Sequence, residues 1–325
     1  MKIDLHTNIG AFPASDRKGS QKQWASVDDI VEHLVKFNIT HHMCLYPYDG
    51  YHYMEELQAR LPDVVHWGVQ CVMHHEPDDT VPTDHLELDC NNSDRPLSKG
   101  IKIASHRGWW RDTVLTDPYS GTDYSDVKFM KRILDRVPAG SLVSMHTQGS
   151  SSPTNTSTPI SVANLAARYP DLKFIINHAG DYGTRMGTAK PGATRLVEDT
   201  KKAMPNLLRH AQSRGVIANA VELAEWFHNI FLDSSNFMIH KADILARTDQ
   251  WCIGTDIPFA DPQFYDYDKE LADYLKIIDP SLIERCYSNT LNYINSDINT
   301  LLKAAADSKD RYYQSLRKSD ENQVV

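Results

Sequence analysis

The feature that most constrains the fold is a regular alternation between short apolar runs and amphipathic stretches with a helical period. The apolar runs are Lys2–His6, Ile39–Tyr46, Val64–Val72, Gly100–Ala104, Ser141–His146, Leu172–His178, Asn229–Asp233 and Trp251–Asp256. Strands that alternate with helices predict a parallel sheet with right-handed crossovers. Eight such units in a chain of 325 residues fit a closed (β/α)8 TIM barrel, which typically needs about 250 residues plus insertions.

The competing architecture is a doubly wound open sheet. Such a sheet usually has a glycine-rich phosphate-binding turn after its first strand, and the sequence has none there. We therefore expect one barrel domain over residues 1–300 and a polar helical extension or tail over residues 301–325. The stretch 73–99 is rich in proline, aspartate and asparagine. It predicts an irregular crossover, and a short additional strand at His85–Leu88 is left open.

Helix start signals support the alternation. Ser26 precedes a run with acids in its first turn and apolar residues on one face, which is typical of a capped amphipathic helix. Thr158 with Pro159 predicts another helix start. Two further helices are expected near Lys269–Ile278 and Ser281–Ile294.

The charge balance and the cysteines limit the partners. A formal net charge of -9 with a pI near 5.9 argues against a nucleic-acid-binding surface, which needs a basic face. The five cysteines form no Cys-x-x-Cys pair, so we interpret them as reduced residues of a cytoplasmic protein. No apolar stretch approaches membrane-spanning length, and the first strand starts too early for a signal peptide. The expected partner is a small-molecule substrate, with no nucleic acid and no membrane; a homo-oligomer is left open.

Polar residues gather where the strands end. Asp4, His6 and Asn8 cluster around the end of the first strand, while His146, His178 and Asp256 end the fifth, sixth and eighth. In a barrel the carboxyl ends of all strands meet on one rim, where active sites are built. Any one of these histidines is more often a hydrogen-bonding residue than a ligand. Their coincidence on separate strands favours a divalent metal site, since imidazole and carboxylate suit zinc, manganese or ferrous iron.

Several segments also resemble a known family. They are "IDLH", "KGIKI", "MHTQG", "YPDLKFIINHAG", "CIGTDIPF" and "CYSNTLNYI". In this order over residues 2–295 they are similar to the amidohydrolase superfamily. The closer similarity is to its amidohydrolase-related branch, which includes aminocarboxymuconate-semialdehyde decarboxylase-like metal-dependent hydrolases. The resemblance implies a TIM barrel of the metal-dependent hydrolase type.

The resemblance also implies a ligand set. His6, the residue at position 8, His146 and Asp256 would hold one divalent metal, with zinc expected and manganese or ferrous iron as alternatives. His178 would move a proton beside the metal-bound water, and Asp256 would also act in catalysis. This chain departs from the family at Asn8, where the family usually has a second histidine. An amide oxygen is a weaker ligand than imidazole, but three protein ligands can suffice for a catalytic site.

The reaction expected from these residues is attack of metal-bound hydroxide on a carbonyl, with cleavage of a C–N or C–O bond in an amide, lactone or ester. Two alternatives stay open: a metal-dependent non-oxidative decarboxylase, and a lapsed barrel that serves as a binding scaffold. Candidate substrate-binding residues follow the fourth and sixth strands: Lys102, His106, Arg107, Trp109, Arg111 and Arg185. Arginine can hold a carboxylate and tryptophan can stack on a flat substrate. An equally weighted reading is that the tryptophans cap the barrel and the arginines are solvated.

Overall fold

The computed structural model describes most of the barrel strands and the helices nearest to them. The described residues are 1–10, 25–72, 87–103, 133–147, 162, 165–166, 169–180, 220–221, 223–225, 227–235, 242–257, 266–304 and 307. In this part of the chain, no helix has both the length and the apolar composition that a membrane crossing requires.

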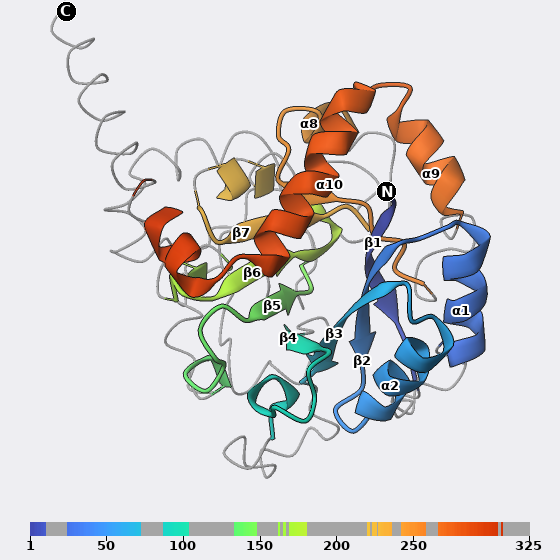
Figure 1. Ribbon diagram of the computed structural model, residues 1–325. Helices are drawn as coiled ribbons and strands as arrows, with labels where there is room; N and C mark the ends of the chain where they lie inside the picture. Colours follow the sequence, from blue (N-terminus) through green and yellow to red (C-terminus); the bar gives the residue numbers. More distant parts are fainter. Residues whose placement is uncertain are drawn as a thin grey trace, which may run out of the picture.

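Eight parallel strands follow one another around a barrel in sequence order (Figure 1). They are β1 (Ile3–Asn8), β2 (His41–Tyr46), β3 (Val65–Cys71), β4 (Ser98–Ile103), β5 (Leu142–Met145), β6 (Lys173–Ile176), β7 (Ile230–Asp233) and β8 (Trp251–Cys252). The chain after β8 closes the ring onto β1. Leu5 N–H donates to Ile253 O at 2.8 Å, and Asp256 N–H donates to His6 O at 2.7 Å. The predicted (β/α)8 TIM barrel is confirmed, with a strand at each of the eight apolar runs.

Helices cover the outside of the strands. Within the described residues the helices are α1 (Val27–Lys36), α2 (Tyr51–Arg60), α8 (Ala242–Leu245), α9 (Tyr267–Tyr274) and α10 (Pro280–Asn295). Short 3-10 turns lie at η2 (Asp89–Asn91) and η5 (Asn177–Gly180). The predicted N-cap of α1 is present as a capping box between Ser26 and Asp29. The helices expected near residues 269–278 and 281–294 correspond to α9 and α10. In Figure 1, α10 crosses in front of the barrel, and it contacts β8.

Some expectations fall on parts of the chain that are not described. Thr158 and Pro159 lie outside the described residues, as do residues 73–86 of the expected irregular crossover. Residues 87–88 are not in a strand, and η2 follows them directly. Residues 298–304 are helical, while most of the stretch 305–325 is not described. The domain boundary at residue 300 therefore stays a prediction.

An irregularity in β1 decides which of its side chains enter the barrel. The pairing with β2 advances from Asp4↔His42 to Thr7↔Cys44, so β1 has one extra residue over this step. An extra residue reverses the alternation of side chains beyond it. Asp4 accordingly faces outward and accepts a hydrogen bond from His33 Nε2 of α1 at 2.8 Å. The expected cluster at the end of the first strand is thus divided, with His6 and Asn8 on the inner side.

Two buried residues, Gly100 and Lys173, determine how β4 packs on β5 and how β6 packs on α10. A β-carbon on Gly100 of β4 would lie 1.9 Å from the carbonyl oxygen of Leu142 in β5, so the glycine of "KGIKI" allows these strands to approach. Lys173 of β6 is buried and donates to Ile294 O at 2.9 Å and to Ser296 O at 2.6 Å. Its ammonium group thereby satisfies carbonyl groups at the end of α10, which otherwise lack partners within the helix.

Candidate active site

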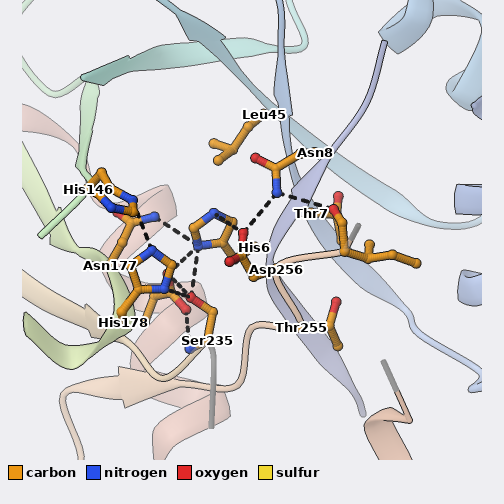
Figure 2. A network of polar contacts seen from close by, with 12 residues as sticks. His6, Thr7, Asn8, Leu45, His146, Asn177, His178, Ser235, Thr255 and Asp256 are labelled. Atoms are coloured by element: carbon orange, nitrogen blue, oxygen red, sulfur yellow. Dashed lines mark hydrogen bonds and ion pairs between the residues drawn. The ribbon is translucent and has the colours of Figure 1, made fainter. Parts of the chain in front are cut away.

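His6 occupies the centre of a buried polar network at the carboxyl ends of the strands (Figure 2). Its Nδ1 atom lies 2.5 Å from Oδ2 of Asp233, at the end of β7. Its Nε2 atom lies 3.3 Å from Oδ1 of Asp256, which follows β8. Because an ionised carboxylate can only accept hydrogen bonds, we assign a proton to Nδ1 of His6, which donates it to Asp233. The Nε2 atom then faces Asp256.

The two carboxylates respond differently to burial. Burial by itself raises the pKa of Asp233, but the charge of His6 and the hydrogen bonds from His6 and Ser235 outweigh it, so the net pKa is lowered. Burial also raises the pKa of Asp256, and the opposing charges of His6 and Lys102 only partly offset it, so the net pKa stays raised. Asp233 is therefore the carboxylate that stays ionised, and Asp256 is the one that is protonated more easily.

The hydroxyl of Ser235 joins three of these side chains. Its Oγ atom donates to Oδ2 of Asp233 at 2.9 Å. It also lies 3.0 Å from Nδ1 of His6 and 2.8 Å from Nδ1 of His178. Since the Ser235 proton goes to Asp233, its oxygen can accept the proton on Nδ1 of His178. One hydroxyl thus orients imidazoles that come from β1 and from the end of β6.

A second imidazole pair continues this network. Nε2 of His178 lies 3.0 Å from Nδ1 of His146, and the two rings meet edge to face with their centroids 4.7 Å apart. If Nδ1 of His178 carries the proton, its Nε2 accepts, so Nδ1 of His146 is the donor. This assignment places the lone pair of His146 on Nε2. In this assignment each group donates to the next, from His146 through His178 and Ser235 to Asp233. The Asp233 carboxylate, which can only accept, sets the direction of these hydrogen bonds.

Two residues of the site hold unusual backbone conformations. His178 has φ 59° and ψ 21°, and Asp256 has φ 54°. The left-handed region costs a residue other than glycine about 1 kcal/mol or more. Such strain persists where the surrounding structure enforces it, and it is concentrated at functional sites. His178 comes two residues after the end of β6 and Asp256 four residues after the end of β8, so the strained positions lie in the turns that carry the polar network.

Asn8 is a hydrogen-bond donor in this site. Its Nδ2 atom donates to Oδ1 of Asp256 at 3.0 Å and to the carbonyl oxygen of Ile257 at 3.1 Å. The amide thus holds the Asp256 carboxylate in place. Its oxygen is turned away from this contact (Figure 2). Asn8 therefore positions Asp256, and whether it also binds a metal stays a prediction.

Gly254 leaves the space that the site needs between β8, β7 and β1. A β-carbon at this position would lie 2.4 Å from Oδ1 of Asp233 and 2.7 Å from Cβ of His6. Both distances are shorter than real β-carbon contacts. The glycine of "CIGTD" is therefore required by the close packing of the network against the last strand.

The donor atoms fit a divalent cation at one place in particular. Nε2 of His6 and Oδ1 of Asp256 are 3.3 Å apart, close to the separation of about 3.4 Å expected between two ligands of a tetrahedral ion with bonds near 2.1 Å. Asp233 on the other nitrogen of the same ring is the carboxylate–histidine support typical of metal ligands. A second group, formed by His6, His178 and Asp233, has its donors within 4.8 Å of one another. The Ser235 hydroxyl contacts all three of those side chains, so the His6–Asp256 pair is the better fit.

The structure brings the five predicted residues of the metal and catalytic set to one rim: His6, Asn8, His146, His178 and Asp256. His146 joins them through His178, and its place as a metal ligand stays a prediction. Lys102 is buried on β4. His106, Arg107, Trp109, Arg111 and Arg185 lie outside the described residues.

Sequence reasoning missed three residues of the network: Asn177, Asp233 and Ser235. Asp233 ends its apolar run just as Asp256 ends the next one, so the strand-end signal was available for it. The side-chain amide of Asn177 lies 2.8 Å from Nδ1 of His6 and 2.8 Å from Oγ of Ser144. Asn177 and Ser235 look like ordinary turn residues in sequence, and only the tertiary contacts reveal their place.

Solved structures with this fold come from several bacteria. No protein-family model matches the chain, and no curated protein matches it. A probable 2-pyrone-4,6-dicarboxylic acid hydrolase of Acinetobacter baumannii, with citric acid bound, is 14% identical with a TM-score of 0.52, over 91% of this chain and 99% of that one. An amidohydrolase of Burkholderia multivorans with bound zinc is 10% identical with a TM-score of 0.54, over 91% and 100%. Amidohydrolase 2 of Bifidobacterium longum subsp. infantis is 13% identical with a TM-score of 0.51, over 91% and 99%.

These likenesses establish the architecture. The chain has the (β/α)8 barrel fold of these solved structures along nearly its whole length. The resemblance read from the sequence segments is confirmed at the level of the fold. At 10–14% identity, substrate and reaction need an argument from the site itself.

Proposed function

We propose that this protein is an enzyme, a metal-dependent hydrolase of the amidohydrolase type. It cleaves a C–O or C–N bond in the ester, lactone or amide of a small molecule. The observation that carries this proposal is the pairing of His6 Nε2 with Asp256 Oδ1 at 3.3 Å on the barrel rim. A strained Asp256 with a raised pKa and a buried chain of imidazoles beside it are the components that hydrolysis needs.

The cofactor proposed is one divalent metal ion, with zinc preferred over manganese and ferrous iron. His6 and Asp256 would hold it, with His146 and Asn8 as further candidates, and the zinc bound in the Burkholderia amidohydrolase supports the choice. Such an ion supplies Lewis acidity and a water of lowered pKa. Asp233 fixes the ring of His6 through Nδ1, and Asn8 fixes the carboxylate of Asp256.

The proton-transfer roles fall to Asp256 and His178. The carboxylate of Asp256 would accept a proton from an attacking water. The two ring nitrogens of His178 contact Ser235 and His146. The ring can therefore take up a proton on one nitrogen while it releases a proton from the other. The partner is a small molecule in the cytoplasm, in keeping with the acidic net charge and five unpaired cysteines.

The proposal is tested by product analysis on a panel of carboxylate-bearing lactones, esters and amides. Hydrolysis adds one water to the substrate mass, whereas decarboxylation releases carbon dioxide, so mass spectrometry separates the two reactions. Asp256→Asn should lower turnover at least about a hundredfold, because removal of one acid–base group typically costs that much. Carbon dioxide release would favour the lyase. Absence of any reaction with zinc, manganese or ferrous iron added would favour a binding scaffold.

A further inference from the structure

Lys102 is a buried cation that the network around His6 does not use. It is next to last in β4 and only 4% exposed. Its Nζ atom has no hydrogen-bond partner within the described part of the chain. A buried ammonium group without a hydrogen-bond partner is costly, because it has lost its hydrogen bonds to water and has formed none in exchange.

The register of the sheet shows where this side chain points. Lys102 is aligned with Ser144 of β5, and aligned residues on neighbouring parallel strands project to the same face. Ser144 faces the barrel interior, because its hydroxyl donates to Asn177 Oδ1 and Asn177 in turn contacts His6. Lys102 therefore points into the same interior, below the rim that carries the candidate metal site.

The charges across the barrel agree with this placement. Burial lowers the pKa of Lys102 to about 8, against the opposing effect of Cys71, Asp233 and Asp256. β4 is three strands from β7 and four from β8 in the sheet order. The two carboxylates can act on Lys102 only through the interior. They attract the ammonium group without forming a hydrogen bond to it, which leaves its three donors available to a ligand.

We propose that Lys102 is the carboxylate-binding residue of the substrate pocket, which makes the natural substrate an anion with a carboxylate remote from the bond that is cleaved. This inference rests on the proposed function and adds its substrate class. A carboxylate pairs with a buried lysine through short charge-assisted hydrogen bonds. Specificity follows, since a substrate without the carboxylate leaves the lysine unpaired.

The test is binding, measured by calorimetry without turnover. Isophthalate and glutarate serve as probes, with isophthalamide and glutaramide as neutral counterparts of the same shape. Wild-type protein should bind the carboxylates at least about tenfold more tightly than the amides. Lys102→Met should abolish that preference. The matched control is Lys99→Met on the same strand, where Lys99 is exposed and donates to the carbonyl oxygen of Pro96, and it should keep the preference.

Thermal unfolding separates a ligand-binding lysine from a structural one. Burial is the largest effect on this ammonium group, ahead of the attraction of Asp233 and Asp256, so its removal in Lys102→Met should raise the melting temperature. A lower melting temperature, an unchanged preference in Lys102→Met, or equal binding of carboxylates and amides by the wild type would each overturn the proposal. Because no step of this test needs catalysis, its failure would leave the hydrolase proposal standing. Conversely, carboxylate binding without hydrolysis of any panel member would reject only the hydrolase proposal.

Discussion

The hydroxyl oxygen of Ser235 lies 2.8 Å from Nδ1 of His178, and this contact sets the orientation of an imidazole that is held on a strained turn. The same hydroxyl donates to Asp233, so it links the His178 ring to a buried carboxylate. The network therefore depends on one small side chain that follows β7.

Replacement of Ser235 by alanine should lower turnover while the protein stays folded. The substitution removes the hydroxyl that lies 2.8 Å from Nδ1 of His178, and partners of this kind typically contribute about ten- to a hundredfold to activity. We expect a fall in kcat of that size with a small change in melting temperature. Ser288→Ala on the exposed side of α10 is the control and should leave kcat unchanged. Equal activity of Ser235→Ala and the wild type would remove the hydroxyl from the working site.

Asp233→Asn should keep the shape of the site and remove its charge. Oδ2 of Asp233 accepts the hydrogen bond of His6 Nδ1, and the two atoms lie 2.5 Å apart. An amide there can present an N–H to the ring and favour the wrong tautomer. We expect kcat and metal affinity to fall by about ten- to a hundredfold, measured by steady-state assay and by metal titration. Asp243→Asn on the exposed start of α8 should change neither quantity.

Gly254→Ala should disturb both stability and the site. The added β-carbon would lie 2.4 Å from Oδ1 of Asp233, and overpacking of this kind costs about 1–3 kcal/mol of unfolding free energy. Gly140 is the informative control, because its φ is +84° and nothing lies within 4 Å of the position of an added β-carbon. Gly140→Ala should cost about 1 kcal/mol through backbone strain alone and leave activity intact. Denaturant unfolding and turnover together check this pair, and a fully active Gly254→Ala would contradict the packing argument.

The fold was more predictable than the site, for a physical reason. Strand and helix periods are local properties, so all eight strands could be located from apolar runs. The residues on the inner face of β1 could not be predicted in this way. One extra residue after Asp4 reverses the alternation of side chains, so Asp4 faces outward and contacts His33 of α1. Polar residues at strand ends identified His6 and Asp256. Ser235 and Asn177 act through contacts with chain segments far away in sequence, which no local pattern encodes.

Metal removal should distinguish the ligands from the proton-transfer residue. His6→Ala and Asp256→Ala each remove a donor of the pair at 3.3 Å and should lose the metal, as measured by elemental analysis. His178→Asn leaves that pair intact and should retain the metal while kcat falls by about a hundredfold or more. Dialysis of the wild type against a chelator should lower its melting temperature, because a bound ion stabilises only the folded state. Full metal content in Asp256→Ala would exclude this carboxylate as a ligand.

Lys173 gives a prediction that concerns stability and its pH dependence. Burial lowers the pKa of this lysine to about 8, below its unfolded value near 10.5. Between about pH 8 and pH 10.5 the unfolded chain therefore binds more protons at this position than the folded one, so the contribution of Lys173 to stability rises with pH over this range. The neutral amine still donates hydrogen bonds to Ile294 O and Ser296 O.

Lys173→Met would leave both carbonyl groups without this donor. The substitution should lower the free energy of unfolding by about 1–3 kcal/mol at pH 9.5. The loss should be smaller at pH 7.5, because there the wild type bears the full penalty of a buried charge. Denaturant midpoints of both proteins at the two pH values give the comparison, with Lys99→Met as the exposed control. A difference between wild type and Lys173→Met that shrinks as pH rises would show that the ammonium form is the one that α10 requires.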